Sequence, residues 1–439
     1  MTTAAGRQAA YAWIPDESAR RASGARRILS DEVYWERNET KPRHNQLNGP
    51  APLWAEDLLT VARAVFAADR YTRRDEFFDR WTRRISLSVP VSAPDRWEAA
   101  LAHLIPLLNT TTGDLWQIEF TVRRDMYVQD SLPGGIASIG EVSLFSGGLD
   151  SLAWTAQRAA VRPNGALLLV TFREPGLLGK VQREVYKQVH QHGDRNARQL
   201  VYSQEVRGPK DRTLKLERST RSRGLLYAAT GVRVAAAENI GVLHIPENGQ
   251  VAVNPPLSAS RSGACSTRSV HPWTLYHLNQ LIIAIGGTVK VHNPLAALTK
   301  GEVCCMAKTA KIPEDIVTST LSCGSSPVRQ RNQPNVPNCG SCFPCLIRRA
   351  GLLHAFKRDR TRYATAPWDA ALPPDWTVHW RAVKGWLQKE FTPLDLLADT
   401  PLPPHQQPED LLPVIRKGRE ELQALVDAAP DRGRSAPAR

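Results

Sequence analysis

The sequence lacks any apolar run of membrane-spanning length, although 42% of its 439 residues are hydrophobic. A transmembrane helix needs about 18 or more consecutive apolar residues, so the chain is not expected to cross a membrane. Residues 1–22 also lack the apolar segment of a secretory signal peptide. We therefore expect a cytoplasmic protein with no membrane partner.

Two further patterns are missing. No G-x-x-x-x-G-K-[ST] loop stands between a strand-like and a helix-like segment, which argues against a P-loop NTPase. The seven cysteines also do not suggest a disulfide framework, because their number is odd and four of them crowd into residues 323–345. Such crowding is typical of a metal site.

The charge balance is basic, with 57 Lys and Arg against 43 Asp and Glu and a formal net charge of +14. This balance favours an acidic partner, such as a nucleotide, nucleic acid or an acidic protein surface. A solvated basic surface without a specific ligand explains the same composition. The charge therefore permits a nucleic-acid partner but does not require one.

The length predicts two or three domains, and the hydrophobic pattern divides the chain into four parts. Apolar residues recur at helical spacing in 58–66 and 97–108, and they alternate as in strands in 85–91 and 116–122. We expect a basic, partly disordered segment at 1–50, an α+β accessory domain at 51–135, an α/β domain at 136–365, and a helical extension at 366–439 with a disordered tail.

Strand-like and helix-like segments alternate from Val142 onward. This alternation predicts a doubly wound parallel sheet, whose ligands bind beyond the carboxyl ends of the strands. Helices are expected at 181–191 and 223–238. Strands are expected near 142–145, 166–172, 200–206, 241–245 and 288–292.

A glycine loop follows the first of these strands and precedes a helix-like stretch. Consecutive glycines let the backbone approach an anion, and the N–H groups at a helix start point towards it. The pattern therefore predicts a phosphate-binding loop, although a plain glycine turn between strand and helix would also fit. The loop resembles the pyrophosphate-binding loop of the ATP pyrophosphatases, which cleave ATP between the α and β phosphates. Its residues are Ser146, Gly147, Gly148, Leu149, Asp150 and Ser151.

The second strong motif is a C-x15-C-x2-C-x2-C array formed by Cys323, Cys339, Cys342 and Cys345. Four thiolates suit one tetrahedral ion, and a closed four-cysteine set is typical of structural zinc. An iron–sulfur cluster would accept the same ligands. The Pro- and Asn-rich loop inside the array cannot bury a core of its own, so it needs a bound metal to hold its fold.

Three cysteines lie outside the array. Cys304 and Cys305 fall on a helix-like stretch after Lys300 and are expected to be small buried apolar residues, with a reactive thiol as the alternative. Cys265 has no such context.

The order of motifs resembles that of the QueC-type 7-cyano-7-deazaguanine synthases over residues 140–352. These are ATP pyrophosphatases of the adenine nucleotide alpha hydrolase-like fold. Besides the glycine loop, the shared motifs are Ser222-Arg223 before a helix, Asn293-Pro294-Leu295, the run Leu298 to Glu302, and a Cys-Gly-x-Cys-x-x-Cys-Leu-x-Arg array from Cys339 to Arg348.

Other features differ from the biosynthetic branch. A long segment precedes the glycine loop, and Gly224 stands where biosynthetic enzymes usually have Asn. The runs 247–249, 254–256 and 266–272 look more like QueC-like proteins of anti-phage operons, which include the QatC component of Qat systems and a related type IV CBASS component. In that branch the resemblance implies operon-encoded protein partners, including a protein acceptor, an ATPase and a nuclease.

The resemblance implies that ATP and Mg2+ activate the carboxylate of a 7-deazaguanine, which then forms an amide with the N-terminal amine of a partner protein. The glycine loop would bind pyrophosphate, and Asp150 would fix this loop or lie near Mg2+. Arg223 and Lys300 match phosphate-facing cations, with surface charges as the alternative. Glu247 and Asn248 are placed to read the donor edge of the base, although a simple turn also explains them. His271 is expected to be a helix cap or an acid–base group.

Three other functions stay open. A biosynthetic nitrile synthase would use ammonia instead of a protein amine. A tRNA-modifying pyrophosphatase would suit the basic charge, but no C-x-x-C pair lies beside the glycine loop. A non-catalytic nucleotide sensor would not need the intact loop.

Overall fold

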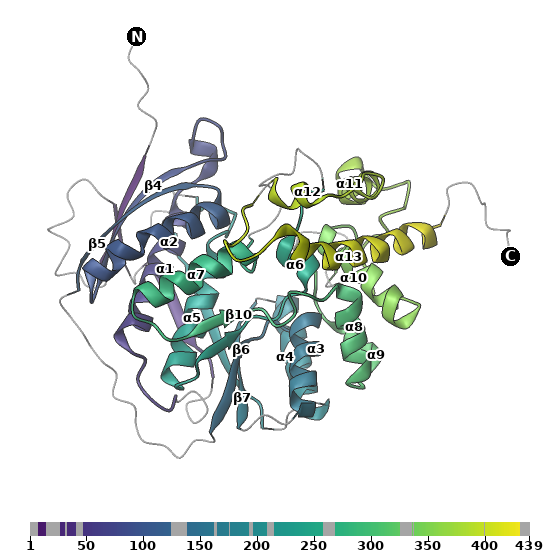
Figure 1. Cartoon of the computed structure of the whole chain (residues 1–439), viewed down its shortest axis with the longest axis horizontal. Helices are drawn as coiled ribbons and strands as arrows, with labels where there is room; N and C mark the ends of the chain where they lie inside the picture. Colours follow the sequence, from purple (N-terminus) through teal and green to yellow (C-terminus); the bar gives the residue numbers. More distant parts are fainter. Residues whose placement is uncertain are drawn as a thin grey trace, which may run out of the picture.

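The computed structural model describes residues 8–14, 27–30, 33–40, 47–123, 138–161, 165–174, 176–192, 196–208, 215–257, 268–324, 336, 338–398 and 400–430. Cys265 lies outside these residues, as do residues 431–439 of the tail that was expected to be disordered. The described chain is an α/β structure with two sheets and helices around them (Figure 1). None of its helices is both long and apolar enough to span a membrane.

The larger sheet contains the five strands that the alternating pattern predicted, and these five are parallel to one another. The strand order is β10-β9-β6-β7-β8-β3. From β6 the chain first adds β7 and β8 on one side, and it later adds β9 and β10 on the other side. β3 (Tyr34–Asn38) closes one edge antiparallel to β8. The parallel strands are β6 (Ile139–Leu144), β7 (Ala166–Phe172), β8 (Arg198–Val206), β9 (Val242–His244) and β10 (Lys290–His292).

Helices cover both faces of this sheet, as β7 shows. Leu167 and Leu169 pack in one apolar cluster, while Leu168 and Val170 pack in the other. Successive side chains of a strand point to opposite faces, so each face has its own helix layer. One layer contains α3 (Leu149–Val161), α4 (Gly176–His192) and α8 (Lys300–Thr309), and the other contains α1 (Leu53–Tyr71), α5 (Arg223–Ala237) and α7 (Pro272–Ala284).

The smaller sheet corrects one expectation. Its order is β2-β1-β4-β5 and its strands are all parallel, so the accessory unit is α/β and not α+β. The helix α2 (Pro94–Thr112) connects β4 to β5 as a crossover, which parallel pairing requires and which alternation alone does not reveal. The described parts of residues 1–50, a segment expected to be partly disordered, contribute β1 (Ala9–Trp13), β2 (Arg27–Leu29) and β3. The remaining strands are β4 (Arg84–Val91) and β5 (Leu115–Val122).

The accessory unit shares its core with the larger sheet. One apolar cluster contains residues of β4, α1 and α2 together with residues of α5, α7 and β7. In particular, α1 packs on α5 and α2 packs on α7. The buried helix faces are rich in alanine, which lets the helices approach closely.

The C-terminal part forms a separate apolar cluster around the long helix α13 (Pro408–Ala428). Trp380 and Trp386 are buried in it, whereas Trp376 is partly exposed. Figure 1 shows α13 beside α10 and α6, and α13 also contacts α8. The other helices here are α6 (Gly249–Val253), α9 (Glu314–Ser319), α10 (Phe343–Phe356), α11 (Val378–Leu387) and α12 (Pro393–Leu397).

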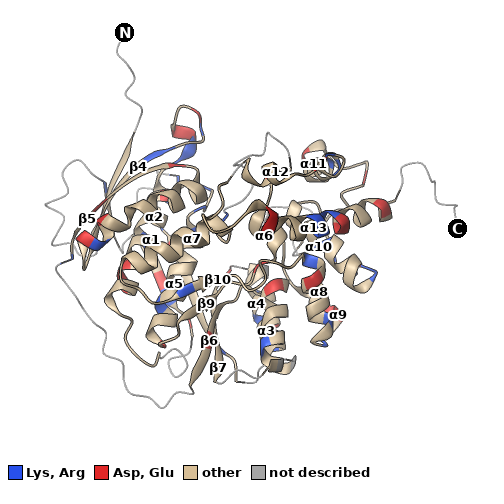
Figure 2. Cartoon of the chain, in the orientation of Figure 1, with Lys and Arg blue, Asp and Glu red and all other residues tan. Residues whose placement is uncertain are grey.

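Acidic and basic residues are interspersed along the outer helices (Figure 2). Several of them pair with each other, as Lys417 does with Glu302 at 2.7 Å and Arg358 with Glu314 at 2.6 Å. Part of the basic charge is therefore balanced within the described chain.

Candidate nucleotide site and cysteine cluster

The glycine loop lies at the carboxyl end of β6, where the strand order reverses. Gly147 has a φ of +74°, and a Cβ there would lie 2.9 Å from the Cα of Gln182. A Cβ on Gly148 would lie 2.9 Å from the carbonyl oxygen of Leu321. Both glycines are therefore required by close packing, in addition to any contact with a ligand.

Hydrogen bonds hold the loop in shape. The Gly148 N–H donates to Ser146 Oγ at 3.2 Å, and Ser151 Oγ donates to the Gly148 carbonyl at 3.0 Å. The buried Gln182 of α4 donates to the Ser146 carbonyl at 3.1 Å and accepts from the Glu174 N–H at 3.0 Å. Sequence analysis missed Gln182, because one glutamine on an amphipathic helix carries no distinguishing signal.

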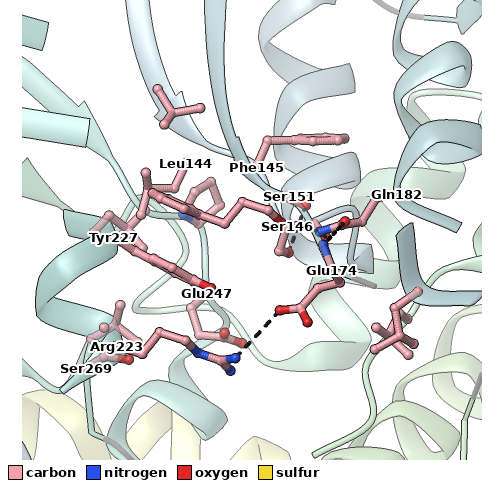
Figure 3. Close-up of a pocket in the computed structure, with 18 of the residues that line it drawn as sticks. Leu144, Phe145, Ser146, Ser151, Glu174, Gln182, Arg223, Tyr227, Glu247 and Ser269 are labelled. Carbon is pink, nitrogen blue, oxygen red and sulfur yellow. Dashed lines mark hydrogen bonds and ion pairs between the residues drawn. The ribbon is translucent and has the colours of Figure 1, made fainter. Parts of the chain in front are cut away.

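A cavity of about 450 Å3 opens beside the loop. Its polar lining includes Ser146 and Ser151 together with side chains from neighbouring strand ends and helix starts (Figure 3). Its apolar lining includes Phe172 and Tyr227, whose rings stack with centroids 3.7 Å apart and an interplanar angle of 7°. The cavity thus combines hydrogen-bonding groups on one side with a flat aromatic wall on another.

Arg223, the first residue of α5, points into this cavity. Its guanidinium lies 3.6 Å from Glu174 Oε1 and 5.6 Å from the centre of the Tyr227 ring (Figure 3). A Cβ on the next residue, Gly224, would lie 2.3 Å from the Cβ of Ser269. The glycine that departs from the biosynthetic pattern therefore lets α5 pack against the segment before α7.

Asp150 and Lys300 form a buried ion pair. Lys300 Nζ lies 2.6 Å from Asp150 Oδ1, and Asn248 Nδ2 donates to Asp150 Oδ2 at 2.9 Å. Lys300 is 4% exposed and Asp150 6%, so the alternative of a surface charge does not hold for Lys300. Burial alone would raise the pKa of Asp150, but the Lys300 ammonium and the hydrogen bonds hold this pKa below its usual value.

Glu247 lies next to this pair and lines the cavity. Burial, and then the nearby Asp150 carboxylate, raise the pKa of Glu247 well above its usual value. Asn293 fixes the Glu247 backbone, because its side chain accepts from the Glu247 N–H at 3.1 Å and donates to the Glu247 carbonyl at 2.7 Å. Glu247 is therefore a rigidly held carboxyl group whose raised pKa disfavours its charged form.

Asn248 has a different position. It is fully buried, and its side-chain oxygen accepts from the Val251 N–H at 3.2 Å as the N-cap of α6. Its amide donates to both Asp150 and Glu247. Of the two residues predicted to read a base, only Glu247 lines the cavity.

Both carboxylate oxygens of Asp150 are engaged by Lys300 and Asn248. These two contacts fix the Asp150 side chain beside the loop. The carboxylates that line the cavity are Glu174 and Glu247.

The four cysteines of the array gather as the spacing predicted. Their sulfur atoms all lie within 4.8 Å of one another, an arrangement that could hold a metal ion. Cys342 is the N-cap of α10, and Cys345 lies in the first turn of this helix. The Cys342 N–H donates to Cys339 Sγ at 3.3 Å, and the Cys339 N–H donates to Cys323 Sγ at 3.4 Å. Backbone donors to sulfur favour the thiolate form that metals require.

Two buried arginines, Arg348 and Arg349, stabilise the segments that flank the cysteine cluster. Arg348 is fully buried and donates to Thr320 Oγ1 at 2.8 Å and to the Val317 carbonyl at 2.8 Å. Arg349 lies over the Tyr363 ring at 3.6 Å and donates to the Gly340 carbonyl at 3.1 Å. The sequence motif included Arg348 but assigned it no role.

The cysteine cluster adjoins the nucleotide-sized cavity, because Cys323 and Gly324 line it and Leu321 packs on Gly148. A metal bound by the four cysteines would thus stabilise one wall of the cavity.

The remaining candidates are structural. Cys304 is fully buried in an apolar cluster, and burial raises the pKa of both Cys304 and Cys305, so neither is activated as a nucleophile. His271 accepts from the Trp273 N–H at 3.2 Å and caps α7. Burial lowers the pKa of His271 to about 3, which keeps the ring neutral.

No protein-family model matches the chain, and a search of curated proteins finds no significant match.

Proposed function

We propose that the cavity beside the glycine loop binds ATP and that the chain transfers AMP to a carboxylate, with pyrophosphate as the leaving group. The observation that supports this most is the position of the Ser146–Ser151 loop, at the carboxyl end of the strand where the sheet order reverses. Parallel sheets place ligands at this point. Helices on both faces and the order β8-β7-β6-β9-β10 are consistent with a doubly wound ATP pyrophosphatase fold.

The proposed roles follow from position. The loop N–H groups and serine hydroxyls would bind the phosphates, and Arg223 would neutralise negative charge on the leaving group. Lys300 would act on the phosphate side of the cavity through the loop that Asp150 anchors. Mg2+ binds carboxylates together with phosphate oxygens, so Glu174 and Glu247 are better placed to meet it than Asp150.

We propose a 7-deazaguanine carboxylic acid as the second substrate, on the strength of the family resemblance and of Glu247 in the cavity wall. A substrate oxygen attacks the α-phosphorus of ATP, and pyrophosphate leaves to give an acyl adenylate. An amine then attacks the acyl carbon, and AMP leaves as the amide forms and the amine loses one proton. The proposed acceptor is the N-terminal amine of an operon-encoded defence protein in the cytoplasm.

The proposed metal is zinc, because four cysteines with no open position are typical of a structural zinc site. Its role would be to hold the Cys323 segment against the glycine loop.

The test is to incubate the purified chain with ATP, Mg2+, the deazaguanine acid and a co-purified operon partner. We expect AMP and pyrophosphate, and a partner mass increased by the base. Asp150→Asn keeps the shape of the side chain but leaves Lys300 without its counter-charge, and it should lower the rate by at least about 100-fold. Release of ADP and phosphate would contradict the proposal, and free nitrile made with ammonia would favour the biosynthetic alternative.

A further inference from the structure

Two buried carboxylates contact the first turns of α5 and α8, the helices that begin with Arg223 and Lys300. Both carboxylates come from outside the central α/β unit, which is the larger sheet with the helices of residues 136–365. The first is Glu421 of α13, which is 6% exposed. It accepts from the Gly301 N–H at 3.0 Å and from the Thr299 hydroxyl. Gly301 directly follows Lys300, the first residue of α8. A Cβ on Gly301 would lie 2.3 Å from Glu421 Oε1, so glycine is what allows the carboxylate to approach.

A second contact from α13 holds the backbone of Lys300, through Gln250. The Lys300 N–H donates to Gln250 Oε1 at 2.7 Å. Gln250 in turn packs on Gly418 of α13, where a Cβ would lie 2.1 Å from the Gln250 amide nitrogen. Through Glu421 and Gly418, α13 therefore fixes both the Lys300 backbone and the residue after it.

The second carboxylate is Asp69 of α1, which is fully buried. Its Oδ2 accepts from the Ser222 N–H at 3.1 Å and from the Ser222 hydroxyl at 2.5 Å. Ser222 is the N-cap of α5, and Arg223 is the first residue of this helix. Asp69 Oδ1 pairs with Arg83 at 2.6 Å, which holds the carboxylate in place.

The two arrangements share a physical logic. The first N–H groups of a helix have no partner within the helix, and a carboxylate satisfies them while it interacts favourably with the helix dipole. Here each carboxylate is supplied by a segment more than 100 residues away, since Asp69 and Ser222 are 153 residues apart and Glu421 and Gly301 are 120 apart. The capping therefore ties a distant segment to the first turn of α5 or α8.

We propose that Asp69 and Glu421 are positioning residues, which fix the helix starts that carry Arg223 and Lys300. This inference rests on the proposed function, because it takes Arg223 to act on ATP and Lys300 to act through the loop that Asp150 anchors. The accessory unit and the C-terminal helix then serve the site directly, in addition to any role in binding a partner. A displacement of about 1 Å at a catalytic group can cost about 100-fold in rate. Loss of either carboxylate should therefore lower kcat more than it raises KM.

The test compares Glu421→Ala with Glu421→Gln and with Glu420→Gln at an exposed neighbour. Asp69→Asn is compared with Asp95→Asn, an exposed position of the same accessory unit. We expect kcat for AMP formation to fall about 10- to 100-fold in Glu421→Ala and Asp69→Asn, with KM for ATP within about threefold. Glu421→Gln should recover much of the rate, because its amide oxygen still accepts from Gly301. Asp69→Asn has no such rescue, because its single amide oxygen cannot both accept from Ser222 and face Arg83.

A second measurement does not depend on activity. Amide hydrogen exchange should become faster at Gly301 in Glu421→Ala and at Ser222 in Asp69→Asn, with little change in the two control variants. Unchanged exchange at these amides would overturn the inference even if the wild type is inactive. Changed exchange with unchanged kcat in an active enzyme would also overturn it. A wild type without AMP-forming activity but with the expected exchange pattern would instead refute the proposed function alone.

Discussion

The accessory unit and the C-terminal extension both contact the central α/β unit, but they do so in different ways. The accessory unit shares one apolar core with the larger sheet, through α1 on α5 and α2 on α7. The extension packs in a second apolar cluster, which it shares with α6 and α10, and it reaches the site through α13 on α6, α8 and α10. Damage to the accessory unit should therefore destabilise the whole fold, whereas damage to the extension should be more local.

The two regions also differ in the number of ionic contacts that support the helices of the site. Arg83 is fully buried between Asp69 and Asp114, and Arg74 also pairs with Asp114, at 3.0 Å. On the C-terminal side, Glu421 pairs with no arginine among the described residues, and burial raises the pKa of its carboxyl group. A dense ion network thus supports α5, and a single carboxyl group supports α8.

The cysteine cluster offers the largest expected effect, and it lies on the C-terminal side. Cys342→Ser should reduce the bound metal from about one ion per chain to near zero and lower the soluble yield, because the four sulfurs need a cation to pack this closely. Elemental analysis and thermal unfolding measure the two effects. Cys305→Ser, outside the cluster, is the matched control and should keep the metal. Iron in place of zinc, or a well-folded protein without metal, would contradict the prediction.

Arg83 tests whether the accessory unit is part of the global fold. Arg83→Leu leaves Asp69 without its ion pair and removes one partner of Asp114, so it should lower the free energy of unfolding by about 3–5 kcal/mol. Denaturant unfolding should show one cooperative transition at a lower midpoint. The control is Arg358→Leu, which breaks an exposed pair with Glu314 and should hardly move the midpoint. A separate early transition of the accessory unit would show that its core is not shared.

The parts of the site that could be predicted from sequence are those encoded locally. Ser146 to Ser151 lie within one strand–loop–helix unit, and three of the four cysteines lie within seven residues, so spacing alone indicates the geometry. The five parallel strands were also predictable, because strand-like and helix-like segments alternate regularly in this part of the chain. By contrast, β1 to β3 are short, and β1 and β3 also pair with β4 and β8, which lie far along the chain.

The residues that sequence analysis missed owe their roles to tertiary packing. Gln182, Asp69 and Glu421 each lie on an amphipathic helix, where a single polar residue usually faces solvent. Their partners are 36 to 153 residues away, so no local pattern identifies them. Asn248 is a case in which a local pattern suggested the wrong role. Its position at a strand end suggested base recognition, whereas its side chain caps α6 and holds Asp150.

Glu247→Gln gives the smallest expected effect. This variant tests the site independently of the accessory unit and the extension, because Asn293, which belongs to neither region, holds the Glu247 backbone. Its pKa in the folded state is raised well above 4.5, mainly by burial. A raised carboxyl pKa stabilises the fold fully below the unfolded pKa, and this contribution is lost as pH rises towards the folded pKa. Above about pH 4.5, the free energy of unfolding of the wild type should therefore fall with a slope of up to about 1.4 kcal/mol per pH unit from this group.

Glu247→Gln cannot ionise, so it should lack this contribution, and the difference between wild type and variant should grow with pH until Glu247 ionises in the folded wild type. Urea unfolding at several pH values measures the difference. The same linkage applies to a guanine-like ligand, whose donor edge favours the carboxylate and should bind the wild type more tightly as pH rises through that range. Parallel stability curves for the two proteins would show that Glu247 is ionised in the fold and would remove the basis for this pH dependence.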